Sequence, residues 1–252
     1  MAKGIKQIFF VLILFLTLPA CAGGNKKIDS FNEAKRLLRQ SVYANHHETF
    51  YCRGSFDSKG RISLPTGFES QKYKKRANKL EWEHVVPAEH FGQAFIEWRQ
   101  GHEDCLDSKG DYFKGRKCAE KMNNDFRLML SDMYNLYPSI GAVNAVRSNH
   151  HYGMLKDVDP TFSGCEFKYD EESDIVEPPE YTRGAIARTY LYFDAVYSKY
   201  NMSPSTRQLM NAWNNMYPVD SWECERAKKI EKLQGNENTF VKSKCVDLGI
   251  TW

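Results

Sequence analysis

The sequence predicts an α+β fold, mainly helical, in which a single domain of residues 23–252 surrounds a small sheet. Several segments carry apolar residues at helical spacing, whereas only a few short segments alternate apolar and polar residues as strands do. No internal repeat and no shift in composition marks a second domain. Hydrophobic content is ordinary at 42% and charge is balanced, which excludes a disordered chain and a bundle of membrane helices.

Residues 1–22 have the composition of a signal peptide. Lys3 and Lys6 precede an apolar run over residues 8–18, and small residues follow that run. The run is too short to span a bilayer comfortably, and no later stretch is apolar enough to do so. We therefore expect the protein to be exported, to the periplasm or the medium.

The cleavage site allows two interpretations. Cleavage after Ala22 fits an ordinary signal peptide. The alternative is an outer-membrane lipoprotein, cleaved before a lipidated Cys21, although Pro19 is unusual at its position in such a signal.

The cysteines predict disulfide bonds. Setting Cys21 aside leaves an even set, which in an exported chain indicates disulfides. The set is Cys52, Cys105, Cys118, Cys165, Cys224 and Cys245. Six cysteines allow fifteen pairings, and the sequence does not choose among them. Short separations favour Cys105–Cys118 and Cys224–Cys245, leaving Cys52–Cys165, and the absence of Cys-x-x-Cys argues against a thiolate zinc site.

Net charge argues against a uniformly basic nucleic-acid binder. Removing the leader with its two lysines lowers the formal net charge from +3 to about +1. The charge is nevertheless segregated, because acidic residues cluster over 166–180 and basic residues gather before residue 80. The basic residues are Lys72, Lys74, Lys75, Arg76 and Lys79. They could steer phosphates toward the next segment, or they could form a solvated surface.

In the first part of the chain we expect one helix and several short strands. Residues 29–45 fit a helix that begins at a capping box on Ser30. Residues 49–64, aromatic and polar around glycines, predict short strands or turns. Residues 80–86 alternate apolar and charged side chains before a proline, which predicts the central strand, and 91–98 predicts a short helix.

The middle of the chain is less regular. Residues 101–124 are polar and long for a structureless loop, so a disulfide or a function is expected there. Residues 126–146 carry apolar side chains at helical spacing but are interrupted by Pro138 and Gly141, which predicts two short helices.

Three helices are predicted in the last part of the chain. Residues 183–200 carry a regular apolar face. Ser203 is an N-cap before a proline at the first helical position, and that helix ends before Pro218. Residues 220–234 form a further helix that ends at Gly235.

The central strand carries the strongest chemical signal. Glu81 and Glu83 share one face of a strand and His84 points to the other. A carboxylate beside an imidazole can hold a metal and deprotonate a water. The alternatives are a solvated sheet edge, or a carboxylate pair that hydrolyses a polysaccharide.

Other candidates are weaker. The doublets His46-His47 and His150-His151 make poor chelators, because adjacent side chains point apart. Asn135, Asn144 and Asn149 offer amide oxygens that suit Mg²⁺, although helix capping explains each of them equally well.

A series of motifs runs in one order from Ser30 to Cys245. They include Phe50-Tyr51-Cys52, Glu81-Trp82-Glu83-His84-Val85-Val86-Pro87-Ala88, Pro138-Ser139-Ile140-Gly141 with Val143-Asn144, and Arg183-Gly184-Ala185-Ile186-Ala187-Arg188-Thr189-Tyr190. In these motifs the sequence resembles the bacterial periplasmic or secreted non-specific endonucleases of the endonuclease I family, whose active site is a ββα-metal motif.

The resemblance implies roles for four residues. His84 would be the general base, and Glu83 and Asn144 would hold one Mg²⁺, with Mn²⁺ or Ca²⁺ as alternatives. Arg116 would contact the scissile phosphate. These residue types suit the chemistry, because a phosphodiester transition state gains negative charge that a metal and an arginine stabilise.

The resemblance also implies the substrate and the partners. We expect a monomer that cuts DNA, and also RNA, with little sequence preference and leaves 5′-phosphates. No protein partner is implied. The expected nucleic-acid contacts are Lys72, Arg76, Lys79, Arg116 and Arg147.

Several positions depart from the family pattern. Leu130 stands where an acidic residue is typical, and Tyr134 replaces a common histidine. Two cysteines are missing near Gly54 and residues 66–67, and residues 101–114 are lengthened. A nucleic-acid-binding protein with weakened catalysis is therefore the alternative function.

Overall fold

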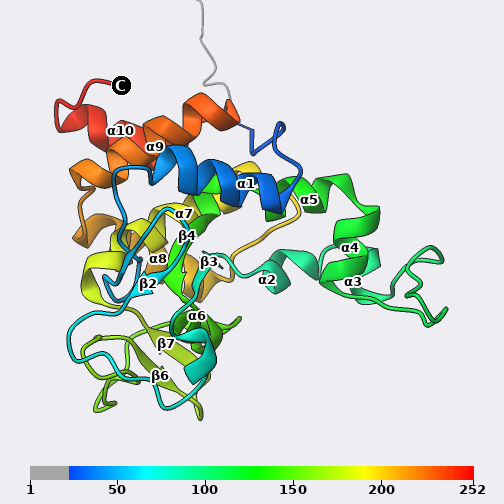
Figure 1. The fold of residues 1–252 in the computed structure, drawn as a ribbon. Coiled ribbons are helices and arrows are strands. Elements are labelled where there is room, and N and C mark those ends of the chain that lie inside the picture. Colours follow the sequence, from blue (N-terminus) through cyan, green and yellow to red (C-terminus); the bar gives the residue numbers. More distant parts are fainter. Residues whose placement is uncertain (1–22) are drawn as a thin grey trace, which may run out of the picture.

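The computed structural model describes residues 23–252, and the predicted leader with Cys21 lies outside the described residues. The described part contains ten α-helices, four short 3-10 or π turns (η1–η4) and three small sheets (Figure 1). The predicted α+β class, mainly helical, is confirmed. Within residues 23–252, no helix is both long and apolar enough to cross a membrane.

Two largely buried strands and the helix that follows them form the centre of the molecule. β3 (Leu80–His84) pairs antiparallel with β4 (Leu136–Ile140), so that Glu83 lies opposite Tyr137. α6 (Gly141–Arg147) begins at the residue after β4 and packs back against β3 (Figure 1). This ββα unit brings together segments that are far apart in the sequence.

β4 corrects the prediction of two short helices over residues 126–146. The structure has α5 (Asn124–Leu130), the 3-10 turn η3 (Met133–Asn135), and then the strand and α6. Pro138 is tolerated in β4 because its carbonyl faces away from β3, where it accepts a hydrogen bond from the Phe50 N–H at 2.7 Å. Its missing N–H therefore lies outside the ladder.

The predictions for residues 29–64 are confirmed. α1 (Phe31–Leu37) continues into the π turn η1 (Leu38–Val42), and the Ser30 hydroxyl caps the start of α1. β1 (Ser55–Phe56) and β2 (Ile62–Ser63) form a small antiparallel pair. A side-chain oxygen at the N-cap satisfies a backbone N–H that has no partner inside the helix.

The single helix predicted over 91–98 is wrong, because the chain forms two shorter ones. These are α2 (Ala88–Gly92) and α3 (Ile96–Arg99). Between them the chain folds back, so that the indole of Trp98 lies against the backbone of Gly92. A Cβ on Gly92 would stand 2.4 Å from the Trp98 ring, so this close approach requires glycine.

The polar stretch 101–124 contains both an element of structure and a disulfide, as its length predicts. α4 (Arg116–Met122) closes it, and the Cys105–Cys118 disulfide ties the first turn of α4 to the loop. The Gly115 N–H donates to the Trp98 carbonyl at 3.0 Å. These two links fix the position at which α4 begins.

The basic segment ends in a short turn, and the acidic segment forms a small sheet. The turn is η2 (Lys74–Arg76), directly before β3. β5 (His151–Tyr152), β6 (Lys168–Asp170) and β7 (Ile175–Glu177) form a sheet in the order β5-β7-β6. β7 pairs parallel with β5 and antiparallel with β6.

Helices make up most of the last seventy residues. They are η4 (Glu180–Thr182), α7 (Arg183–Val196), α8 (Pro204–Met216), α9 (Ser221–Gln234) and α10 (Thr239–Asp247). The predicted starts of α7, α8 and α9 hold, with Ser203 and Asp220 as the caps of α8 and α9, and Gly235 adopts the left-handed conformation after α9. The helix predicted over 183–200 ends earlier, at Val196, and η4 and α10 are not among the predicted helices.

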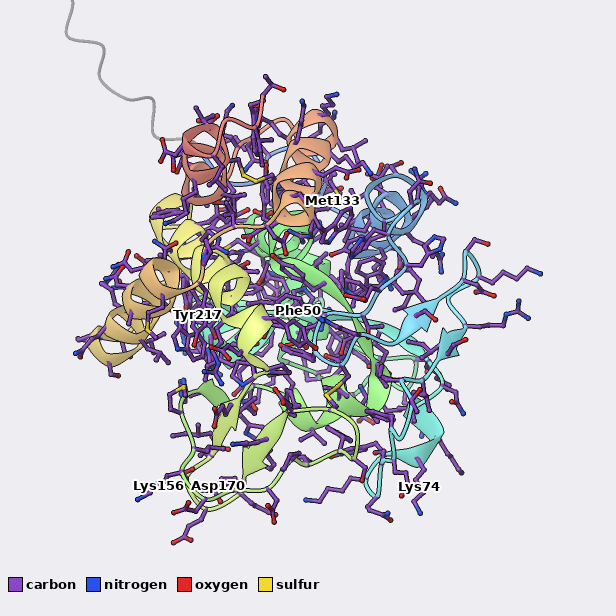
Figure 2. All side chains as sticks on the ribbon, turned by 90° about the vertical axis from the view of Figure 1, so that its left-hand side faces the viewer. Phe50, Lys74, Met133, Lys156, Asp170 and Tyr217 are labelled. Atoms are coloured by element: carbon purple, nitrogen blue, oxygen red, sulfur yellow. A yellow bond between two sulfur atoms is a disulfide. The ribbon has the colours of Figure 1, made fainter. Side chains whose placement is uncertain are left out.

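Three disulfides link the predicted cysteine pairs (Figure 2). Cys52–Cys165 joins the segment before β1 to the loop before β6, and Cys224–Cys245 joins α9 to α10. The pairing that short separations favour is therefore confirmed. The buried apolar side chains form one core cluster, which agrees with a single domain.

Candidate active site

One cleft of about 380 Å³ contains all four residues predicted to carry the chemistry. Glu83 and His84 end β3, Asn144 lies in the middle of α6, and Arg116 is the first residue of α4. β4 and α6 bring Asn144 beside β3. Helix α4, fixed by its disulfide, supplies Arg116 from another side.

His84 is held in one orientation. Its Nε2 lies 2.8 Å from the Leu130 carbonyl, and because a carbonyl can only accept, Nε2 carries the hydrogen. The Nδ1 lone pair is then free. Burial lowers the pKa of His84 to about 3, and the charges of Arg116 and Lys35 act in the same direction. At neutral pH the imidazole is therefore uncharged, and its Nδ1 lone pair is unprotonated.

The departure at Leu130 does not affect this contact. The group that meets His84 is the backbone carbonyl of residue 130, which any side chain would supply. The Leu130 side chain is fully buried in the core. The hydrogen bond is thus compatible with leucine at this position.

Glu83 is buried, with 2% of its surface exposed. Its Oε1 accepts a hydrogen bond from the Tyr51 hydroxyl at 2.9 Å and lies 3.3 Å from Nε of Arg147. Burial raises the pKa of Glu83 to about 7, although Arg147 and Tyr51 oppose the shift. Its other oxygen, Oε2, has no hydrogen-bond partner among residues 23–252.

Asn144 is oriented by Glu81, the second acid of β3. Its Nδ2 donates to Glu81 Oε2 at 2.7 Å, and the same carboxylate accepts two hydrogen bonds from Arg76. Since a carboxylate only accepts, the amide must present its NH₂ group to Glu81, which leaves Oδ1 free. Gly141 makes room for this arrangement, because a Cβ there would lie 2.7 Å from Glu81 Oε1.

The free oxygens of Glu83 and Asn144 suit a magnesium-type ion. Both residues line the same cleft, and carboxylate and amide oxygens are hard ligands. The described residues contain no group of three or more His, Cys, Asp or Glu side chains that could hold a metal. Two protein oxygens with waters filling the remaining positions are the arrangement that Mg²⁺ favours, so the residues present fit this ion.

The guanidinium of Arg116 is available to a ligand. Its carbon lies 5.1 Å from the centre of the Phe31 ring, and none of the described residues offers it a hydrogen bond or an ion pair. Burial lowers the pKa of Arg116, but an arginine remains charged at any physiological pH. A desolvated positive charge in the cleft favours a phosphate there.

The remaining basic residues differ in their surroundings. Lys72 and Lys79 lie on the surface, and Lys72 is 3.6 Å from Glu171. Arg76 lines the cleft but is paired with Glu81.

The prediction that Arg147 contacts nucleic acid is wrong. It has no exposed surface, and its guanidinium donates to the backbone carbonyls of Val85, Ser148 and His150. A side chain enclosed in this way cannot reach a phosphate. From the sequence, Arg147 lies about one helical turn after Asn144, which suggested that it faces the same cleft.

Tyr51 and Tyr152 lie beneath Glu83 and were not assigned to the site. The hydroxyl of Tyr51 lies 2.5 Å from that of Tyr152, and both rings are buried. The Phe50-Tyr51-Cys52 motif was the available signal for Tyr51. Nothing in the sequence near Tyr152 indicates its position.

Comparisons with known proteins match nearly all of the described chain. A family model described as Endonuclease I matches residues 30–245. An extracellular deoxyribonuclease of Aeromonas hydrophila is 37% identical over 94% of this chain and 96% of its own length. Endonuclease-1 of Buchnera aphidicola is 37% identical over 87% of this chain and 83% of its own. A periplasmic deoxyribonuclease of Aeromonas hydrophila is 34% identical over 96% of both chains. The chain belongs to the endonuclease I family.

Proposed function

We propose that this protein is an exported endonuclease that hydrolyses the phosphodiester bonds of DNA, and also of RNA, with one Mg²⁺-type ion. Relatives named as extracellular and periplasmic deoxyribonucleases support DNA as the substrate. The observation that carries the proposal is the cleft itself. It gathers an imidazole with a free nitrogen, two free oxygen ligands and an unpaired guanidinium from residues 23–252.

His84 is the general base in this mechanism. Nδ1 takes a proton from a water molecule, while Nε2–H goes on donating its hydrogen bond to the Leu130 carbonyl and holds the ring in place. The water oxygen then bonds to phosphorus. The bond from phosphorus to O3′ breaks, and O3′ leaves with a proton from solvent. The products are a 3′-hydroxyl and a 5′-phosphate.

Glu83 and Asn144 would hold the metal through their free oxygens, Oε2 and Oδ1. When bound, Mg²⁺ would supply positive charge that stabilises the transition state and the leaving oxygen. Arg116 stabilises the same charge from the side of α4, and its partial burial reduces the solvent reorganisation that this requires.

Weak sequence preference follows from the type of contact. Lys72, Arg76 and Lys79 lie at the cleft or on the surface close to β3 in sequence, and their partners on nucleic acid are phosphates. Phosphates carry no sequence information. A 2′-hydroxyl is not required in this mechanism, so DNA and RNA are both substrates.

The competing functions fit the geometry less well. A polysaccharide hydrolase needs Glu81 and Glu83 on either side of a substrate bond, but Glu81 is engaged by Arg76 and Asn144. A binding protein with weakened catalysis would lack a free base or free metal ligands. Here both are present.

The experiment is a nicking assay with supercoiled plasmid, with and without EDTA. Wild type should nick the plasmid only with a divalent ion, and His84→Ala should lose at least two orders of magnitude in rate. His47→Ala, at an exposed histidine that does not line the cleft, is the matched control. An intact plasmid with wild type at every divalent ion tested would contradict the proposal.

Export is proposed from the leader and from the relatives' names. Mass spectrometry of the mature N-terminus distinguishes the two forms. A free N-terminus at Gly23 indicates a soluble periplasmic or secreted protein, whereas an acylated Cys21 indicates a lipoprotein.

A further inference from the structure

We propose that Arg147 is a positioning residue, which with Tyr51 and Tyr152 holds the carboxylate of Glu83 from the protein interior so that Oε2 faces the metal. This inference rests on the proposed function. It concerns residues on the side of Glu83 opposite the cleft, none of which would touch metal or substrate.

The guanidinium of Arg147 is fixed by four groups. Nη2 donates to the Val85 carbonyl at 2.9 Å, and Nη1 donates to the carbonyls of Ser148 and His150 at 3.1 and 2.9 Å. Nε has no hydrogen-bond partner among residues 23–252 and lies 3.3 Å from Glu83 Oε1. A planar group whose two Nη atoms are held by carbonyls cannot swing into the cleft, so its Nε edge is directed at one carboxylate oxygen.

The tyrosines form a chain of hydrogen bonds with one direction. The Glu83 carboxylate can only accept, so the Tyr51 hydroxyl donates to Oε1. The Tyr152 hydroxyl must then donate to Tyr51, whose own hydrogen is already used. The Tyr152 ring also lies under the Arg147 guanidinium, 4.2 Å from ring centre to guanidinium carbon. Oε1 is thus held by two buried groups that support each other.

The backbone directly after Arg147 is strained, and this strained turn positions two of the carbonyls that bind the guanidinium. Ser148 has φ of +45°, a conformation that residues other than glycine rarely adopt. It lies in a tight turn closed by the His150 N–H to the Arg147 carbonyl at 3.2 Å. That turn is what directs the Ser148 and His150 carbonyls at the guanidinium. Strain of this kind persists only where surrounding contacts hold it.

Arg147 also links the two segments that carry the metal ligands. It follows Asn144 by three residues on α6, and through Val85 and Glu83 it is bonded to the end of β3. The separation between the Glu83 and Asn144 oxygens therefore depends on it. Outer groups that orient metal ligands commonly change metal affinity by about 10- to 100-fold when they are removed.

The test is Mn²⁺ binding to the full mature protein without nucleic acid, followed by electron paramagnetic resonance. Tyr51→Phe removes one hydroxyl and Arg147→Lys keeps the charge but not the planar fork. Each should weaken Mn²⁺ binding by about ten-fold. Arg188→Lys is the matched control, because Arg188 is equally buried and bonds Glu223 at 2.7 Å away from the cleft.

A nicking assay supplies the second measurement. In Tyr51→Phe, the Mn²⁺ concentration for half-maximal rate should rise about ten-fold, while KM for plasmid at saturating Mn²⁺ stays unchanged. If Tyr51 had only a structural role, Tyr51→Phe would lower the folded fraction. It would then leave both the Mn²⁺ concentration for half-maximal rate and KM for plasmid unchanged. If Arg147→Lys fails to fold by circular dichroism, Tyr51→Phe decides the matter alone.

Two results would overturn the inference, and they are distinguishable. Folded Tyr51→Phe that binds Mn²⁺ as tightly as wild type shows that the buried network does not position Glu83. A wild-type protein that neither binds Mn²⁺ nor nicks plasmid would overturn the proposed function, and this inference with it.

Discussion

Glu81 is bonded to residues on both sides of the ββα unit. Arg76 from η2 donates to its carboxylate, and its Oε2 accepts from the amide of Asn144 on α6. By local pattern alone Glu81 and Glu83 are equivalent neighbours on one face of a strand, and the family resemblance singles out Glu83 as the metal ligand. The structure separates them, because Glu83 is buried over Tyr51 whereas Glu81 orients another side chain.

Replacing Glu81 should test that division. In Glu81→Gln the side chain keeps its size, but it loses the charge that pairs with Arg76 and can present its own NH₂ group to Asn144. We expect the nicking rate at saturating Mg²⁺ to fall by about ten-fold. Glu48→Gln, at an exposed acid, should not change the rate. Equal rates for Glu81→Gln and wild type would mean that Asn144 needs no orienting partner.

His90 should make the stability of the fold depend on pH. Burial lowers the pKa of His90 to about 4, with Arg147 and His151 acting in the same direction. The unfolded state keeps the ordinary pKa near 6.5, so it takes up a proton first as the pH falls. Stability is therefore complete above pH 6.5 and declines between pH 6.5 and about 4.

The decline attributable to His90 is at most about 3 kcal/mol, and less because the ring retains some solvent contact. In His90→Gln the side-chain amide can still donate to the Asn149 carbonyl, as Nε2 does at 2.9 Å. Urea unfolding at several pH values should give a shallower decline for the variant than for wild type over this window. Parallel curves would show that His90 titrates normally in the folded protein.

At the scale of single elements, α4 shows how a catalytic group is placed by covalent and backbone links. Arg116 is its first residue, and the helix is only seven residues long. The Cys105–Cys118 bond and the hydrogen bond from Gly115 to Trp98 anchor the start of the helix. The loop 101–114 can therefore extend outward without moving Arg116.

Removing this disulfide should cost stability and activity together. For a sequence separation of 13, the loop-entropy model gives about 3 kcal/mol, so Cys105→Ser with Cys118→Ser should unfold at markedly lower urea. The nicking rate at a temperature where the variant is folded should also fall, because Arg116 loses its anchor. Cys224→Ser with Cys245→Ser is the comparison, since that bond joins α9 to α10 outside the cleft. It should lower stability but not the rate of the folded protein.

β4 is a strand that the local sequence does not predict. Its five residues, Leu136–Ile140, contain a proline and lie between helical segments, so local propensity favours helix ends. The strand forms because β3 offers a pairing edge and because Pro138 falls on the side that bonds Phe50 instead. Such pairing is a property of segments distant in sequence, and no local pattern contains it.

For the whole molecule, charge distribution matters more than net charge. The net charge is close to zero without the leader, yet basic residues precede β3 in the sequence and acidic ones lie in the β6–β7 region, where Glu171 is 3.6 Å from Lys72. Nucleic-acid binding that neutralises phosphates releases counterions, so affinity falls as salt rises. Each basic residue that contacts a phosphate contributes about one unit to the slope of log affinity against log salt concentration.

Lys79 offers a test of this surface. In a His84→Ala background, which binds without cutting, Lys79→Ala should weaken DNA affinity and reduce the slope of log affinity against log salt by about one. The loss should be similar for unrelated DNA sequences, because phosphate contacts carry no sequence information. Fluorescence anisotropy measures both quantities. Lys228→Ala, on α9, is the control, and an unchanged slope for Lys79→Ala would remove it from the binding surface.

The sequence by itself determined the features that depend on near neighbours or on matched motifs. The caps at Ser203 and Asp220 and the stop at Gly235 are local, because a helix end is satisfied by residues within one turn. Short separations favoured two of the disulfide pairs and left Cys52–Cys165 as the third, and the structure was needed to choose this pairing among fifteen. The four residues of the cleft came from motifs whose order matches the endonuclease I family.

Only the tertiary structure decided which polar groups face the cleft and which face inward. Arg147 looked like a surface base, and it is an enclosed partner of Glu83. Tyr51 and Tyr152 are a hundred and one positions apart, yet their hydroxyls meet. Burial and hydrogen-bond direction arise when distant segments pack, and these determine whether a charge binds substrate or positions another side chain.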